Sequence, residues 1–267
     1  MKGIVLKSTI IACSLVAFTS CKNGKSDEKN ETATETQDST ATASKITLEK
    51  LENSPAYADA SLKLVEPKTE KVGEKVNFKF DVENYELGQQ TDSPINDKLA
   101  SSGKGQHIHF IVDDNPYSAH YTPDFEKDFS EGNHTVVAFL SRSYHEAVKN
   151  ENSFVAKNFQ VGDVKSDDKV DLTKPTLIYS RPKGEYSGDD TKNLLLDFFL
   201  LNTDLSENGN KVKATINGEE FEITDWQPYI VKGLPKGKVT VHLQLVDSEG
   251  NLIEGPYNDV TREVTLK

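Results

Sequence analysis

The stretch Lys75–Val82, which reads KVNFKFDV, alternates polar and apolar side chains. Because successive side chains of a β-strand point to opposite faces, this period of two predicts a strand with one face in a core. A later stretch, Leu194–Leu201 (LLLDFFLL), is apolar at every position but one, and its periodicity alone also fits a buried helix. The two stretches align with each other inside a longer internal repeat, and this alignment favours a strand for both.

The sequence beyond residue 60 is a tandem repeat. Positions of the first half recur in the same order in the second half, at a spacing of 115 to 118 residues at first and of 104 or 105 residues later. The matching pairs include Leu62 and Leu177, Phe78 and Leu196, Phe110 and Ala214, Gly132 and Gly237, and Phe159 and Val264. Because the spacing changes only where turn residues lie, we interpret the two halves as copies of one domain.

Each half contains several short alternating runs separated by turn dipeptides such as Asn217-Gly218. This pattern is typical of an immunoglobulin-like β-sandwich. We therefore predict an all-β protein with two tandem immunoglobulin-like β-sandwich domains. The first is expected over residues 47–163 and the second over residues 164–267, with the polar segment Gly162–Thr173 between them.

The N-terminal residues have the pattern of a signal peptide. A basic start is followed by the apolar run Ser8–Phe18 and by Thr19-Ser20-Cys21. The pattern resembles the lipobox of bacterial lipoproteins, which implies that residues 1–20 are removed and that Cys21 carries lipid. An ordinary secreted protein, cleaved nearby, is the alternative. Residues 21–46 are expected to form the lipidated cysteine and a flexible tether, because Lys22–Ser44 lacks aromatic, Leu, Ile and Val side chains. The membrane, reached through this lipid, is then a partner, and the predicted location is the bacterial cell envelope, at the outer membrane.

Composition excludes several classes of function. The chain has 31 Lys and Arg against 43 Asp and Glu, which gives a net charge of −12. Binding to nucleic acid needs a clustered basic surface, which this balance does not supply. Two cysteines and one methionine exclude a disulfide framework, a multi-cysteine zinc site and a blue-copper site.

The histidines are distributed unequally between the two copies. Five of the six fall in the first copy, at His107, His109, His120, His134 and His145, and only His242 falls in the second. The repeat register places Ile108 and Phe110 in the core of the first sandwich, so His107 and His109 are expected to point outward. The second copy has Lys211 and Lys213 at these positions.

This asymmetry suggests a metal site. Two histidines separated by one residue of a strand lie on one face about 7 Å apart, which is a common way to begin a Zn(II) or Cu(II) site. His134 and His145 are the candidates for a third ligand, and we assign His134 to the set His107, His109 and His134. The sequence establishes no cofactor, and the alternative is that the strand histidines bond to the long segment Gly88–Gln106, which the second copy lacks.

The run Ser141–Glu146 (SRSYHE) suggests a second kind of site. An arginine beside hydroxyl groups and a histidine can bind a phosphate or a carboxylate. The run faintly resembles the phosphate-binding loop of forkhead-associated domains, with one extra residue before the histidine. The alternative is that Arg142 pairs with a carboxylate of this acidic protein. A hydrolytic triad is disfavoured, because no nucleophile elbow or oxyanion-hole glycine cluster accompanies these residues.

The segments Gly105–Asp114, Pro116-Tyr117 and Phe139–His145 resemble uncharacterised Gram-negative two-domain lipoproteins that are sometimes labelled phosphopeptide-binding. The resemblance covers most of residues 62–267 and implies a phosphopeptide ligand. We therefore predict a non-enzymatic, lipid-anchored envelope protein whose first sandwich binds a ligand, such as a peptide, phosphopeptide or partner protein, through Ser141, Arg142, Ser143 and His145. The alternative is a Zn(II)- or Cu(II)-binding envelope protein that uses the His107/His109 strand.

Overall fold

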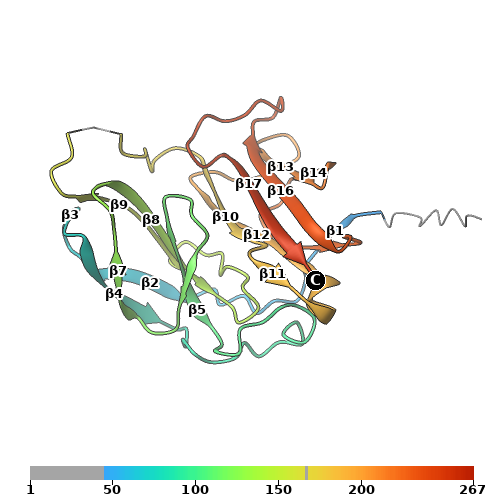
Figure 1. Cartoon of the computed structure of the whole chain (residues 1–267), viewed down its shortest axis with the longest axis horizontal. Coiled ribbons are helices and arrows are strands. Elements are labelled where there is room, and N and C mark those ends of the chain that lie inside the picture. Colours follow the sequence, from blue (N-terminus) through green and yellow to red (C-terminus); the bar gives the residue numbers. More distant parts are fainter. Residues whose placement is uncertain (1–44, 166–167) are drawn as a thin grey trace, which may run out of the picture. The chain divides into compact units, whose positions relative to one another are not determined.

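The computed structural model describes residues 45–165 and 168–267 (Figure 1). The signal peptide, Cys21 and all but the end of the predicted tether lie outside the described residues. Apart from one short 3₁₀ helix at Gly188–Thr191, the regular elements of the described part are strands. No helix in these ranges is long and apolar enough to cross a membrane. The predicted all-β class is confirmed.

Two sandwiches are built on the same plan. In the first, one sheet has the strand order β2-β4-β7 and the other β3-β9-β8-β5-β6. In the second, β10-β12-β15 corresponds to the smaller sheet and β11-β17-β16-β13-β14 to the larger one. The strands of the first sandwich are β2 (Ser61–Glu66), β3 (Lys71–Val72), β4 (Lys75–Glu83), β5 (His107–Val112), β6 (Ser118–His120), β7 (Asp124–Asp128), β8 (Gly132–Ser141) and β9 (Phe154–Val161). Those of the second are β10 (Thr176–Arg181), β11 (Glu185–Tyr186), β12 (Leu194–Leu201), β13 (Lys211–Ile216), β14 (Glu219–Ile223), β15 (Tyr229–Lys232), β16 (Gly237–Val246) and β17 (Asp259–Leu266).

The copies also share a local turn, which follows the equivalent strands β5 and β13. Asp113 and Asn217 occupy equivalent positions with φ of 51° and 47°. Each uses a side-chain oxygen to accept the backbone N–H of a threonine, Thr135 at 2.7 Å and Thr240 at 2.9 Å. Short polar side chains of this kind tolerate the left-handed conformation and bond to nearby backbone, which explains their occurrence at this turn.

Strand β12 is the apolar stretch Leu194–Leu201, and all eight of its residues are buried. Leu196 and Phe198 belong to the core of the second sandwich, whereas Phe199 and Leu201 on the opposite face belong to a different apolar cluster. A strand that is buried on both faces needs apolar residues on both, which explains why this one lacks alternation.

The second apolar cluster joins the two sandwiches. It combines Ile111 and Phe139, from the outer faces of β5 and β8, with Phe199 from β12. The rings of Phe139 and Phe199 stack with centroids 4.9 Å apart. The outer face of β5 and β8 is therefore covered by the second sandwich rather than by water.

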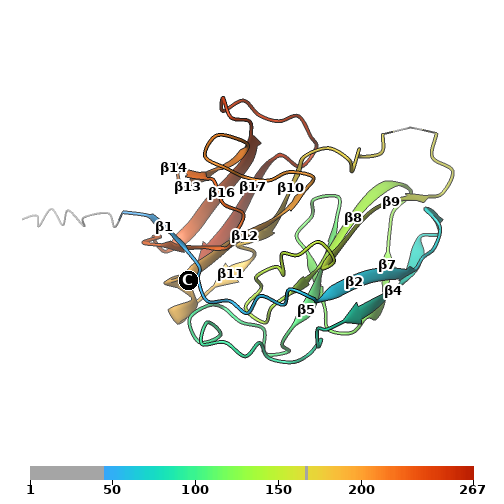
Figure 2. The ribbon, with the colours of Figure 1, turned by 180° about the vertical axis from the view of Figure 1, so that it is seen from behind.

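Strand β1 (Thr47–Lys50) belongs to the second sandwich and not to the first, where the sequence interpretation placed residues from 47 onward. It pairs antiparallel with β15, with Thr47 opposite Lys232. In both views β1 lies beside the strands of the second sandwich (Figures 1 and 2). This pairing satisfies the backbone groups of an otherwise free sheet edge. A four-residue segment carries too little pattern to indicate its partner, so the sequence could not assign it.

The long segment Gly88–Gln106, which the second copy lacks, packs against the rest of the protein, and we call it the strap. Thr91, Ile95 and Leu99 are buried, and Ile95 and Leu99 pack in one cluster with Tyr144 and with Leu195 of β12. The strap therefore covers the loop that follows β8, and it contributes to the burial of the residues beside that loop.

We predict that Phe199→Ala lowers the free energy of unfolding by about 3–5 kcal/mol, because it removes a fully buried ring from the cluster between the sandwiches. Val65→Ala, at a side chain that is 37% exposed, should change it by less than about 0.5 kcal/mol. Urea denaturation measures both. A loss below about 1 kcal/mol for Phe199→Ala would contradict the described packing.

Candidate metal centre

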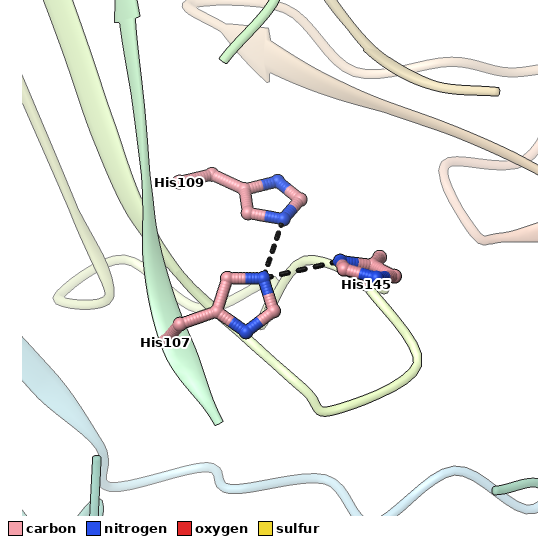
Figure 3. Close-up of side chains that lie close together, drawn as sticks. All are labelled: His107, His109 and His145. Atoms are coloured by element: carbon pink, nitrogen blue, oxygen red, sulfur yellow. Dashed lines mark hydrogen bonds between the residues drawn. The ribbon is translucent and has the colours of Figure 1, made fainter. Parts of the chain in front are cut away.

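Three histidine nitrogens converge at one point between the sandwiches (Figure 3). His107 and His109 project from β5, and His145 from the loop between β8 and β9. The Nε2 atom of His107 lies 3.0 Å from Nε2 of His109 and 3.1 Å from Nδ1 of His145. The three candidate ligand atoms all lie within 4.8 Å of one another.

These separations suit a bound metal ion. In a tetrahedral site with metal–nitrogen bonds of about 2.05 Å, two ligand nitrogens are separated by about 3.3 Å. The two separations at His107 are shorter than this by only a few tenths of an ångström. The nitrogens of His109 and His145 lie within 4.8 Å of each other, so small rotations of these rings that shorten this separation would place all three nitrogens at bonding distance from one ion.

The outer nitrogens of two rings are held by protein groups. Nδ1 of His107 lies 2.8 Å from the carbonyl oxygen of Gly105, which can only accept, so this nitrogen carries the proton and Nε2 presents its lone pair inward. Nδ1 of His109 lies 3.1 Å from Oγ of Ser180 on β10. A hydroxyl can donate or accept, so Ser180 can serve either tautomer of His109.

The carbonyl that orients His107 depends on a glycine. Gly105 has a φ of 85°, and a Cβ atom at this position would lie 2.4 Å from the carbonyl oxygen of Gln89. Glycine is therefore required where the strap enters β5.

Burial keeps the three imidazoles neutral. His107 and His109 are 0% exposed. Burial lowers the pKa of His107 to about 4 and the pKa of His109 well below its usual value, and like-charge repulsion from the neighbouring His107 lowers the latter further. Burial, and then the charge of Arg181, also lowers the pKa of His145. Neutral imidazole is the form that binds a metal ion.

The backbone at His145 is in the left-handed region, with a φ of 70°. The equivalent residue of the second copy is Gly250, whose φ is 85°, and both loops are closed by the same kind of isolated bridge, Ser141 with Ala147 and Val246 with Leu252. A histidine here costs about 1 kcal/mol that glycine avoids. In the first copy this less favourable residue stands at the position that supplies the third imidazole.

Buried charged groups hold the loop that carries His145. Nη1 of Arg142 lies 3.0 Å from a carboxylate oxygen of Glu146. Asp197, the single polar residue of β12, is fully buried and accepts the backbone N–H of Ala147 at 2.8 Å while it pairs with Lys149. The second sandwich thus positions the loop from which His145 projects.

The expected orientation of the strand histidines needs one correction. His107 and His109 point away from the core of the first sandwich, as the alternation predicts, because Ile108 and Phe110 fill that core. They do not face solvent, because the outer face of β5 is covered by the second sandwich and the strap. A strand pattern identifies the two faces but not what covers the second one.

The structure does not bring His134, which we assigned to the metal set, to this cluster. Nδ1 of His134 lies 2.5 Å from Oδ2 of Asp113, and its Nε2 lies 2.9 Å from the carbonyl oxygen of Ser130. The third imidazole is that of His145, which we had assigned to an anion site. Spacing along the sequence could not distinguish the two, because His134 lies near the start of β8 and His145 just beyond its end, and the spacing does not say which end lies beside His107 and His109.

The remaining residues of the anion hypothesis lie inside the protein. Ser141 and Ser143 are 0% exposed and Arg142 is 3% exposed. Arg142 pairs with Glu146 and donates to the carbonyl oxygens of Ala147 and Pro55, and the Ser143 hydroxyl donates to Asn96 at 2.7 Å. Arg142 is therefore paired with a carboxylate, which is the alternative that the sequence analysis gave for this residue.

Sequence reasoning missed two residues beside the cluster. Tyr117 has its hydroxyl 3.2 Å from Nδ1 of His145, and its ring stacks on that of His109 with centroids 3.5 Å apart. Ser180 comes from the other copy of the repeat, so no local pattern could connect it with His109. In contrast, the one carboxylate in the run LLLDFFLL was a visible sign that Asp197 has a buried polar partner.

We predict that His145→Gly is more stable than His145→Ala by about 1 kcal/mol, because both remove the imidazole and only glycine relieves the left-handed backbone. Urea denaturation of the metal-free variants measures the difference. Equal stabilities, or a more stable alanine variant, would show that His145 is not held under backbone strain.

The stability of the metal-free protein should fall in acid partly through His120, which lies outside the cluster. Burial lowers the pKa of His120 to about 4, and its ring stacks on Phe125 with centroids 3.4 Å apart. The unfolded chain, with a histidine pKa near 6.5, binds the proton first. The stabilisation is therefore complete above pH ~6.5 and is lost as the pH falls toward the folded pKa, by at most about 1.4 kcal/mol per pH unit. His120→Phe keeps the ring stack and should reduce the slope of the unfolding free energy against pH between about pH 4 and pH 6.5. An unchanged slope would contradict the assignment.

No protein-family model matches this chain, and no curated protein matches it. Among solved structures, the fibronectin(III)-like modules of Clostridium thermocellum CbhA are similar at 14% identity, over 77% of this chain and 94% of that one, with a TM-score of 0.28. SGBP-B of the Bacteroides ovatus mixed-linkage glucan utilization locus, in complex with a mixed-linkage heptasaccharide, is 11% identical over 77% of this chain and 47% of that one, with a TM-score of 0.25. The central fibronectin-III array of RIM-binding protein is 9% identical over 78% of this chain and 68% of that one, with a TM-score of 0.24. Similarity at this level identifies no ligand and no activity.

Proposed function

We propose that this chain is a metal-binding protein that holds one Zn(II) or Cu(II) ion through Nε2 of His107, Nε2 of His109 and Nδ1 of His145. The observation that carries the proposal is the convergence of these three nitrogens within 4.8 Å of one another, with the two separations at His107 close to those of a tetrahedral site. The second copy supports it, because Lys211, Lys213 and Gly250 stand at the equivalent positions.

The ligand chemistry selects the metal class. Three neutral imidazoles without a thiolate or thioether suit Zn(II) and Cu(II), whereas Ca²⁺ and Mg²⁺ prefer oxygen ligands. Three protein ligands leave a fourth coordination position for a ligand from outside the set. The hydroxyl of Tyr117 lies 3.2 Å from the His145 ligand atom, and we propose that it borders this position.

Binding without turnover is the function that the burial favours. His107 and His109 are 0% exposed, and His109 is covered by Tyr117 and bonded to Ser180 of the other sandwich. A site enclosed in this way can retain an ion but offers little room for a substrate. Because the segment ending at Cys21 resembles a lipobox, we also propose that the protein holds its metal at a membrane of the bacterial envelope.

Calorimetric titration of the full chain with Zn(II) and Cu(II) should show one saturable site. His109→Ala and His145→Ala should each weaken binding by at least about 100-fold. Loss of a group that only hydrogen-bonds to a metal ligand costs about 10–100-fold in affinity, and loss of a residue bound directly to the metal should cost at least as much. His134→Ala and His242→Ala are matched controls that remove a histidine outside the cluster and should leave the affinity unchanged. Absence of saturable binding, or an equal loss in His134→Ala, would refute the proposed function.

A further inference from the structure

Two positively charged side chains lie beside the histidine cluster. Arg181 and Lys183, from the end of β10 and the residues after it, both lie against the ring of Tyr117, which itself stacks on His109. The Lys183 Nζ atom is 4.2 Å from the centroid of that ring, and the Arg181 guanidinium carbon is 5.4 Å from it. Within residues 45–165 and 168–267, no carboxylate is hydrogen-bonded to or ion-paired with the three imidazole rings.

Arg181 is buried without a counter-charge. It is 7% exposed, its Nη1 donates to the hydroxyl of Tyr186 at 2.9 Å, and its Nε is buried without a hydrogen-bond partner. Neither Arg181 nor Lys183 forms an ion pair with a carboxylate of the described residues, although the whole chain carries a net charge of −12. Two uncompensated cations beside one cluster are therefore a particular feature of this site.

These charges oppose a bare metal dication. The three imidazoles are neutral, so a bound ion would keep its full charge close to Arg181 and Lys183 in a partly desolvated place, where charges interact more strongly than in water. A negative charge is needed to offset the total, and the protein groups that touch the cluster supply none.

Building on the proposed function, we infer that the metal ion binds together with a small monodentate anion, such as formate, bicarbonate or azide, which occupies the fourth coordination position. The charges of Arg181 and Lys183 create this requirement, and the Tyr117 hydroxyl is placed to donate a hydrogen bond to the anion. Tyr117 is not itself the anionic ligand. Its ring lies parallel to that of His109, with 11° between the planes, so its oxygen is displaced from the plane that contains the His109 lone pair.

The test is a Zn(II) titration of the full chain at constant ionic strength, with a bulky sulfonate salt in one arm and formate in the other. Formate should strengthen Zn(II) binding at least 10-fold, and by linkage Zn(II) should strengthen formate binding by the same factor. In Lys183→Met and Arg181→Met, Zn(II) should bind more tightly than in the wild type without formate, and the formate effect should fall below 3-fold. Lys192→Met, which removes an exposed lysine of the same sandwich, should behave as the wild type.

A second measurement uses the unsubstituted protein. Azide added to the Cu(II)-loaded chain should produce a saturable azide-to-copper charge-transfer band. A single Zn(II) site with the same affinity in both salts, or a Cu(II) site without the azide band, would overturn this inference and leave the proposed function intact. An undiminished formate effect in both methionine variants would overturn the role of Arg181 and Lys183. Absence of saturable metal binding in either salt would overturn the proposed function and this inference together.

Discussion

The contact between the two sandwiches is the feature on which the candidate site depends. Phe199 of β12 stacks on Phe139 of β8, and the cluster around them covers the outer face of β5. This coverage removes His107 and His109 from water and keeps them neutral. It also brings Ser180 to the outer nitrogen of His109 and Asp197 to the loop of His145. One copy of the repeat supplies the imidazoles, and the other supplies the groups that orient them.

The divergence of the two copies is concentrated at this contact. Lysines at 211 and 213 face outward on β13 in the second copy, where the first has buried histidines. A glycine serves the left-handed position at 250, where the first copy holds a histidine under strain. Such strain persists only where the surrounding structure fixes it, and here the Arg142–Glu146 pair and Asp197 do so. Each residue of the candidate site can therefore be compared with the residue at the equivalent position of the second copy.

Much of the fold followed from the sequence, and less of the site did. Alternation in Lys75–Val82 and the internal repeat predicted the strands and their shared plan, because the core faces of β-strands impose a period of two. The same alternation predicted which way His107 and His109 point, but nothing local states that another domain covers that face. The choice between His134 and His145 failed for a similar reason. The loop that lies beside His107 and His109 is held there by the strap, by Asp197 and by the Arg142–Glu146 pair. The strap and Asp197 are distant from His145 in the sequence, and the sequence analysis assigned Arg142 to an anion site.

The most direct test of the account is a crystal structure of the Zn(II)-loaded chain with anomalous scattering measured at the zinc edge. The account predicts one anomalous peak about 2.0–2.1 Å from the ligand nitrogens of His107, His109 and His145. A peak at one of the carboxylate–histidine pairs outside the cluster instead, Asp113 with His134 or Asp259 with His242, would contradict it.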